Sequence, residues 1–205
     1  TPALHEFCLD HQLDCALVPA GRRLAGFGLA AFDMDSTLIN IETIDELASI
    51  AGIRELSAPL TERAMRGEIN FETSFRQRIA LLKGLPVSAL ETVYEQALQL
   101  NPGAELLIQA LQRHGLKIAL ITSGFEFFAE RLKSRLGLDY AVYNRIGIRD
   151  GKLAGEISGK LIDAAGKTSA LEAHRIKLGL RREQVIAIGD GANHLAMLGM
   201  AGVSI

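Results

Sequence analysis

The chain has 205 residues, of which 48% are hydrophobic and 22% charged, and its formal net charge is −2. This length fits one domain, with or without an insertion, and the hydrophobic fraction is enough for a sizeable core. The small net charge gives no general attraction for nucleic acid or an anionic membrane, and no apolar run reaches the roughly 18 residues of a membrane span. We therefore expect a globular protein with neither kind of partner.

The first thirty residues contain scattered charged residues instead of the apolar segment of a signal peptide. The two cysteines, Cys8 and Cys15, have no metal-ligand spacing and form no disulfide framework. We interpret them as small apolar residues in a reducing compartment, with the cytoplasm as the expected location; a disulfide between them is the alternative. The chain starts at Thr1 without Met, so we expect a truncated N-terminus. A mildly amphipathic segment at 3–13 predicts a helix.

A buried strand is predicted at 28–33, and the sequence FDMDST closes it. Asp33 and Asp35 therefore lie at i and i+2 just after the strand. In open α/β sheets, ligands bind at this carboxyl edge. Two adjacent carboxylates are unfavourable unless a positive charge or a shared proton compensates them, which implies a metal ion or acid–base chemistry.

The segment 41–101 contains no convincing strand and predicts helices at 42–51, 56–66, 71–82 and 88–98. Glycine follows each of the first three, which is a helix-stop signal. A block of helices inserted after a single strand indicates a small cap over the sheet edge.

Strands and helices alternate after residue 103. Helices are expected at 104–113, 126–136, 167–178 and near 193–199, and strands at 117–121, 139–143, 184–188 and 202–205. Asp150-Gly151 predicts a hairpin turn between 145–149 and 152–156, and Thr122-Ser123-Gly124 is predicted to be a turn. This pattern predicts an α/β fold, a Rossmann-like parallel three-layer sandwich. We expect a lead-in segment at 1–27, a core at 28–40 and 102–205, and the helical cap at 41–101.

Polar residues follow three of the predicted parallel strands: Asp33 with Asp35, Thr122 with Ser123, and Asp190 with Asn193. The carboxyl ends of parallel strands share one crevice, so these side chains are expected to converge. Lys167, near the start of a predicted helix, is a fourth element. Each of these four elements alone is a weak signal. Their occurrence in this order, along a sequence of alternating strands and helices, is a strong one.

These four elements match the motifs of the haloacid dehalogenase superfamily. The stretches DMDSTLINIETIDELA, TERAMRGEINFETSFRQRIALLKGL and FEFFAERLKSRLGLDYAVYNRI resemble its phosphoserine phosphatase family almost continuously, over roughly 28–205. The resemblance implies hydrolysis of O-phospho-L-serine to L-serine and phosphate, the last step of serine biosynthesis. It also implies a divalent cation, Mg²⁺ or alternatively Mn²⁺.

The resemblance also implies roles for single residues. Asp33 would be the nucleophile that forms an aspartyl phosphate, and Asp35 the general acid and base. Oxygen ligands for the metal would come from Asp33, the backbone carbonyl of Asp35, and Asp190. Phosphate would be bound by Thr122, Ser123, Gly124, Lys167 and Asn193. The substrate would be bound by Glu42 at its ammonium, Arg78 at its carboxylate, and Met65 and Phe71 as apolar walls.

Each of these residues also has an ordinary structural interpretation. The acid pair could cap a strand end, Glu42 could stabilise a helix N-terminus, and Arg78 could be an exposed charge. Met65 and Phe71 could belong to the core.

Two positions depart from the family pattern. Ser123 stands where the family has a glycine, and it either crowds the phosphate or donates a further hydrogen bond. His194 stands where the family has an acid that supports the metal. Imidazole suits Mg²⁺ poorly, so we hypothesise weaker Mg²⁺ binding and a relative gain for Mn²⁺ or Zn²⁺. The alternative is that His194 points away from the site.

Two other functional interpretations stay open. One is a phosphatase or phosphotransferase that acts on another small phosphorylated metabolite. The other is a catalytically weak relative that binds phosphoserine or a protein. The departures from the family pattern at 123 and 194 support this alternative. A small-molecule substrate is expected, and a homodimer is allowed for.

Overall fold

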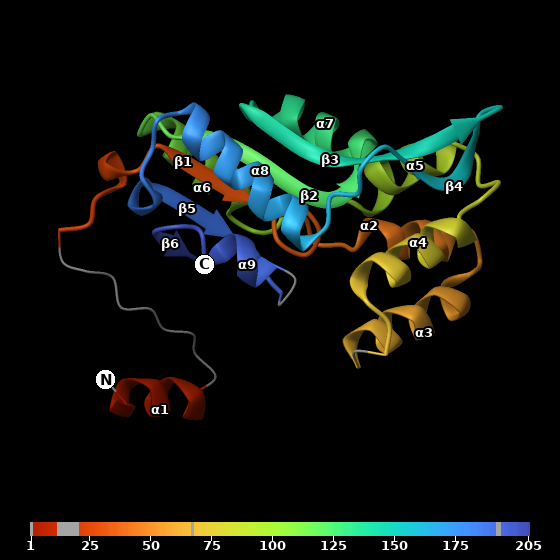
Figure 1. Ribbon diagram of the computed structural model, residues 1–205, viewed down its shortest axis with the longest axis horizontal. Coiled ribbons are helices and arrows are strands. Elements are labelled where there is room, and N and C mark those ends of the chain that lie inside the picture. The colour runs from red at the N-terminus through yellow and green to blue at the C-terminus, as the bar shows by residue number, and fades with distance from the viewer. Residues whose placement is uncertain (1, 12–20, 67, 192–193) are drawn as a thin grey trace.

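The computed structural model describes residues 2–11, 21–66, 68–191 and 194–205. Within them, one sheet has the strand order β4-β3-β2-β1-β5-β6 (Figure 1). The central strand β1 (Leu29–Phe32) pairs in parallel with β2 (Lys117–Phe125) and with β5 (Val185–Ile188). Next to these, β3 (Tyr140–Arg149) and β6 (Val203–Ser204) are also parallel, and only β4 (Lys152–Ser158) runs antiparallel to its neighbour.

Helices cover both faces of the sheet, as the sequence predicted. On one face α6 (Ala104–Arg113) and α7 (Glu126–Leu136) pack into the same buried cluster as Ala30 and Phe32. On the other, α8 (Ala164–Lys177) and α9 (Leu195–Leu198) contact the cluster that contains Leu29 and Ala31. Successive side chains of a strand point to opposite faces, so the fully apolar β1 serves both layers. The predicted three-layer α/β fold is confirmed.

The helices that follow β1 are α2 (Thr43–Ile50), α3 (Arg54–Met65), α4 (Phe71–Leu81) and α5 (Ser88–Thr92). Figure 1 shows α3 and α4 at the end of the molecule toward which the β1 and β5 arrows point. The prediction of one α-helix over 88–98 is wrong, because Val93–Ala97 forms a π-helical turn. The division into a core and a cap remains a prediction.

The hairpin of β3 and β4 extends beyond the parallel part of the sheet and supports these helices. The N–H of Gly84 donates to the carbonyl of Leu153 at 2.9 Å, and the N–H of Leu153 donates to the carbonyl of Leu85 at 2.8 Å. The predicted turn is present, with positive φ of 51° at Asp150 and 70° at Gly151. Two separate strands at 139–143 and 145–149 were expected, but β3 is continuous.

Two further boundaries differ from expectation. The predicted turn at 122–124 is wrong, because β2 continues to Phe125 with an irregular register after Ile121. Helix α8 begins at Ala164 instead of 167, where the Asp163 side chain accepts a hydrogen bond from the Gly166 N–H. Tertiary pairing and a helix cap decide these two boundaries.

At the N-terminus the described residues form α1 (Pro2–Asp10) and a short 3₁₀ turn at Leu24–Gly26. Cys8 is buried, while Cys15 lies outside the described residues, so the disulfide alternative is untested. No helix in the described ranges is long and apolar enough to cross a membrane. The cytoplasmic location and the homodimer stay predictions.

Candidate active site

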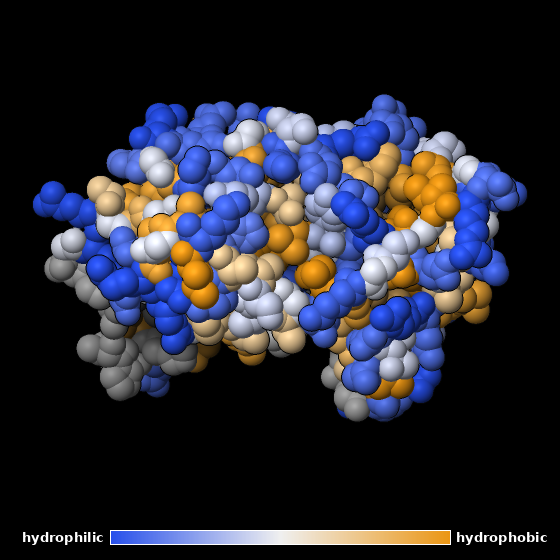
Figure 2. All heavy atoms as spheres, turned by 45° about the horizontal axis from the view of Figure 1, so that its top comes forward, coloured by the Kyte–Doolittle hydropathy of each residue, from blue (hydrophilic) through white to orange (hydrophobic). Residues whose placement is uncertain are grey.

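A cavity of about 620 Å³ opens where β1, β2 and β5 end and α3 and α4 begin to cover the sheet edge. In the space-filling view a notch separates the lobe of α3 and α4 from the rest of the molecule (Figure 2). Most of the sequence-predicted site residues line this cavity. Its charged lining consists of Asp33, Asp35, Glu42, Asp45, Asp190, Lys167 and Arg78. Asn193 lies outside the described residues, and so does the side chain of Met65.

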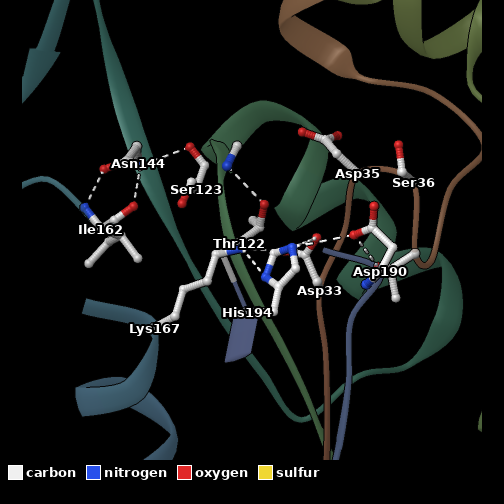
Figure 3. Close-up of polar contacts among 12 residues, drawn as sticks. Asp33, Asp35, Ser36, Thr122, Ser123, Asn144, Ile162, Lys167, Asp190 and His194 are labelled. Atoms are coloured by element: carbon white, nitrogen blue, oxygen red, sulfur yellow. Dashed lines mark hydrogen bonds and ion pairs between the residues drawn. The ribbon is translucent and has the colours of Figure 1, made fainter. Parts of the chain in front are cut away.

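The buried ion pair of Asp33 and Lys167 lies at the centre of the site (Figure 3). The Lys167 ammonium donates to Asp33 Oδ1 at 2.5 Å, and the side chains of Lys167 and Asp33 are 3% and 4% exposed. The Asp33 backbone N–H donates to the Ile188 carbonyl, which continues the β1–β5 pairing by one residue and fixes where the carboxylate leaves the sheet. A buried charge without a partner is strongly unfavourable, so each member of the pair depends on the other.

His194 points into the site, so the alternative that it points away is wrong. Its Nε2 lies 3.4 Å from Asp33 Oδ2 and 3.3 Å from Asp190 Oδ1, and its Nδ1 lies 3.1 Å from Lys167 Nζ. Burial lowers the pKa of the His194 imidazole, which favours the neutral ring. Gly189 makes room for it, since a Cβ there would be 2.9 Å from His194 Cγ.

Asp35 is set apart from this group (Figure 3). The hydroxyl of Thr43 donates to Asp35 Oδ2 at 3.1 Å, while Asp35 Oδ1 has neither solvent contact nor a hydrogen-bond partner. Burial first, and then the charges of Glu42 and Asp33, raise the pKa of the Asp35 carboxyl well above its ordinary value. A carboxyl in this state holds a proton that it can donate.

The end of β2 presents a hydroxyl to the cavity. Thr122 Oγ1 accepts a hydrogen bond from the Gly124 N–H at 2.8 Å, which leaves the Thr122 hydroxyl proton available as a donor. The Gly124 amide is thereby engaged within the end of β2. A Cβ added at Gly124 would lie 2.4 Å from Met34 Cε and 3.1 Å from Thr122 Oγ1, so a side chain there would require Met34 to move.

Two residues that the sequence analysis missed hold the parts of the site in place. Asn144, buried in β3, donates to the carbonyls of Ser123 and Ile162 at 2.8 and 3.1 Å and accepts from the Ile162 N–H at 2.8 Å. It thus joins the end of β2 to the loop that leads into α8 and Lys167 (Figure 3). Thr37 joins the loop after β1 to β5, because its hydroxyl donates to Asp190 Oδ1 and accepts from the Asp190 N–H, each at 3.2 Å.

The side of the cavity facing the helices has polar atoms without partners. Arg78 is only 12% exposed, its nearest acid oxygen is Asp45 Oδ1 at 3.7 Å, and its Nε is buried without a hydrogen bond. Thr61 Oγ1, on α3, is likewise buried and without a partner. Phe71 stacks on Phe75 with 5.4 Å between ring centroids and forms an apolar wall.

Glu42 lines the mouth of the cavity and accepts a hydrogen bond from the Ser36 hydroxyl at 2.6 Å. Loss of hydration raises the pKa of Glu42. The hydrogen bond from Ser36 lowers this pKa in part, and the repulsion of nearby acids raises it further. Ser36 itself has a positive φ of 56°, an uncommon conformation for a residue with a side chain. The loop after the acid pair is therefore held in a specific shape at some conformational cost.

The charges around the cavity favour a bound cation. Asp35 holds a proton, and the other four acids of the lining, those of Asp33, Glu42, Asp45 and Asp190, face only two basic side chains. One carboxylate oxygen each of Asp33 and Asp190 and one ring nitrogen of His194 lie within 4.8 Å of one another, which fits a divalent cation. The role expected for the Asp35 backbone carbonyl remains a prediction.

Comparison with known proteins agrees with this geometry. Residues 27–202 match the family model of haloacid dehalogenase-like hydrolases. The phosphoserine phosphatase of Polaromonas sp. is 47% identical over 89% of this chain and 80% of its own length. That of Archaeoglobus fulgidus is 48% identical over 86% of this chain, which spans only 51% of that protein.

A solved structure described as a phospho-aspartyl intermediate analogue of phosphoserine phosphatase superposes with a TM-score of 0.81. It is 40% identical, and the match covers 87% of this chain and 85% of that one. With a matched family model over most of its length, and relatives of this identity, the chain belongs to the haloacid dehalogenase-like hydrolases and, within them, to the phosphoserine phosphatase family.

Proposed function

We propose that this chain hydrolyses O-phospho-L-serine to L-serine and phosphate through an aspartyl phosphate on Asp33. One observation carries the proposal beyond family membership. In the described residues four buried side-chain polar atoms have no hydrogen-bond partner, and those of Asp35, Thr61 and Arg78 belong to the lining of this cavity. An acid, a hydroxyl and a guanidinium suit a substrate that carries an ester oxygen and a carboxylate.

In the first step one carboxylate oxygen of Asp33 attacks the phosphorus, and the bond from phosphorus to the serine oxygen breaks. Asp35 gives its proton to that leaving oxygen, which its raised pKa allows. The Thr122 hydroxyl and the Lys167 ammonium stabilise the charge on the phosphoryl oxygens. The products of this step are L-serine and the phosphorylated Asp33.

In the second step Asp35, now a carboxylate, takes a proton from a water molecule. The water oxygen attacks the same phosphorus, and the bond to Asp33 breaks. Phosphate leaves, and both aspartates return to their starting states. A divalent cation, Mg²⁺ or Mn²⁺, held by Asp33 and Asp190 would supply compensation for the negative charge of phosphate beside these acids.

Selection of the amino acid is assigned to the helical side of the cavity. Glu42 faces the ammonium of the substrate, and Arg78 faces its carboxylate as a two-pronged donor. Phe71 supplies an apolar wall that limits water in the site. Met65 and Asn193 keep the roles predicted for them from the sequence.

Phosphate release from phosphoserine and from glycerol phosphate, with Asp33→Asn as the inactive control, tests the proposal. We expect phosphoserine to be preferred and Asp33→Asn to lose activity by on the order of 10⁴-fold or more. Equal rates on glycerol phosphate would favour a phosphatase or phosphotransferase for another small metabolite. Binding of phosphoserine without turnover, and without trapping of Asp33 by beryllium fluoride, would favour the catalytically weak relative.

A further inference from the structure

The imidazole of His194 fills the space between the two carboxylates that end β1 and β5. Its side chain is 3% exposed, and Nε2 lies 3.4 Å from Asp33 Oδ2 and 3.3 Å from Asp190 Oδ1 (Figure 3). A cation shared by these two acids would approach the same pair of oxygens. His194 therefore has either to leave this position or to become a ligand when the cation binds.

The surroundings of the ring favour its becoming a ligand. Gly189 lies against the ring, since a Cβ added there would be 2.9 Å from His194 Cγ, and His194 as a whole is only 2% exposed. Lys167 Nζ touches the other ring nitrogen, Nδ1, at 3.1 Å. A close-packed interior resists rotation of a ring out of such a place.

The hydrogen on the ring also has to be accounted for. An ammonium group only donates, so without a metal Nδ1 accepts from Lys167 and Nε2 carries the hydrogen of the neutral ring. Ligation through Nε2 needs that hydrogen on Nδ1 instead. Lys167 can release Nδ1 because it keeps its shorter bond, 2.5 Å, to Asp33 Oδ1.

We infer that this site takes a divalent transition-metal ion of the Co²⁺ or Zn²⁺ class in preference to Mg²⁺, with His194 Nε2 as a ligand beside Asp33 and Asp190. Imidazole suits such ions, whereas Mg²⁺ prefers oxygen ligands and keeps several waters. The inference rests on the proposed function in that it names the ion for the proposed hydrolase. Its test measures binding alone.

Metal-free protein, prepared with a chelator, is titrated with Co²⁺ and separately with Mg²⁺ in a calorimeter, and the visible spectrum of bound Co²⁺ is recorded. We expect Co²⁺ to bind at least about tenfold more tightly than Mg²⁺. His194→Asp should reverse this order, raise Mg²⁺ affinity by about 10–100-fold and change the Co²⁺ spectrum. His114→Asp, at an exposed position on the far end of α6, is the matched control and should change neither.

Equal affinity of the two ions for the unmodified protein would overturn the inference, as would a Co²⁺ spectrum that is the same in His194→Asp. If His194→Asp does not fold, His194→Asn replaces it, because its amide oxygen suits Mg²⁺ and it lacks the imidazole. Hydrolysis of phosphoserine with no dependence of Co²⁺ binding on His194 would reject the inference alone. Co²⁺ bound through His194 without hydrolysis would reject the proposed function alone.

Discussion

The two sides of the cavity differ in how many of their polar atoms already have partners. In the strand-end cluster (Asp33, Lys167, Asp190 and His194) contacts of 2.5–3.4 Å link every member to another. In the unpaired set (Asp35, Thr61 and Arg78) each side chain has a buried polar atom with no partner. A buried unsatisfied polar group costs about 1–3 kcal/mol, which a bound ligand removes. The first side is therefore organised by folding and the second is completed by the substrate.

Removing one member of the strand-end cluster should lower stability the most. Lys167→Met leaves the buried Asp33 carboxylate without its ammonium, so we expect the free energy of unfolding to fall by about 3–5 kcal/mol. Denaturant unfolding in the presence of a chelator measures the effect. The exposed Lys160→Met should change little. The double variant Asp33→Asn with Lys167→Met should recover much of the loss, and an unchanged stability in Lys167→Met would remove the distinction between the two sides.

The next largest effect is expected for Asn144, which supports the cluster without belonging to it. In Asn144→Asp a carboxylate faces the carbonyls of Ser123 and Ile162 in place of two donated hydrogen bonds. We expect a loss of about 2–4 kcal/mol in the free energy of unfolding, and a lower kcat with a smaller change in KM. Asn70→Asp is the matched control, because aspartate caps α4 as well as asparagine does. A lower kcat without a loss of stability would contradict the role assigned to Asn144.

Substitutions in the unpaired set should have the opposite effect, because they should weaken substrate binding and leave the stability of the fold unchanged. Arg78→Met removes a charged donor to the substrate carboxylate, worth about 1.5–3 kcal/mol, so KM for phosphoserine should rise by roughly 10–150-fold. Arg76→Met, on the same helix but exposed and paired with Glu72, should leave KM unchanged. Steady-state kinetics and thermal unfolding together decide the point. Equal KM values in the two variants would place the substrate carboxylate elsewhere.

For Asp35 the prediction concerns how the stability of the protein depends on pH. Its pKa in the folded chain is raised, so above the ordinary value of 3.8 the folded state holds a proton that the unfolded state releases. Stability that depends on this group therefore falls as pH rises from about 4 toward the raised pKa. Asp35→Asn is neutral at every pH, so its stability relative to the unmodified protein should increase over that range. Unfolding in a chelator at a series of pH values measures the difference, and a constant difference would refute the raised pKa.

The sequence was sufficient to predict that three members of the strand-end cluster converge, but not that His194 joins them or which contacts support them. These residues, Asp33, Lys167 and Asp190, converge because parallel strands and the helix after them share one edge of the sheet. The alternation of strands and helices in the sequence is enough to indicate that arrangement. Asn144 has no such signal. It is a single polar residue inside a strand, and its partners Ser123 and Ile162 are 21 and 18 residues away.

Local preference also misled at the end of β2. Ser123 and Gly124 favour a turn by residue type, yet Phe125 pairs with Asn144 and keeps the chain extended. The direction of His194 was left open by the sequence for a related reason. It depends on space next to Gly189, which only the packed structure shows.

The smallest effect is expected for Thr61, and it tests the comparison most strictly. Its hydroxyl is buried, lines the cavity and has no partner, so a substrate oxygen is the partner that it lacks. Thr61→Val keeps the shape and removes the hydroxyl. We expect KM to rise by about 2–12-fold, equivalent to one hydrogen bond of 0.5–1.5 kcal/mol, while the free energy of unfolding stays equal or increases. Ser57→Ala on the same helix also removes a buried unpaired hydroxyl, but one outside the cavity lining, so it should leave KM unchanged. A rise in KM for Thr61→Val alone ties the unpaired atoms to the substrate, whereas equal KM values would show that they are only defects of packing.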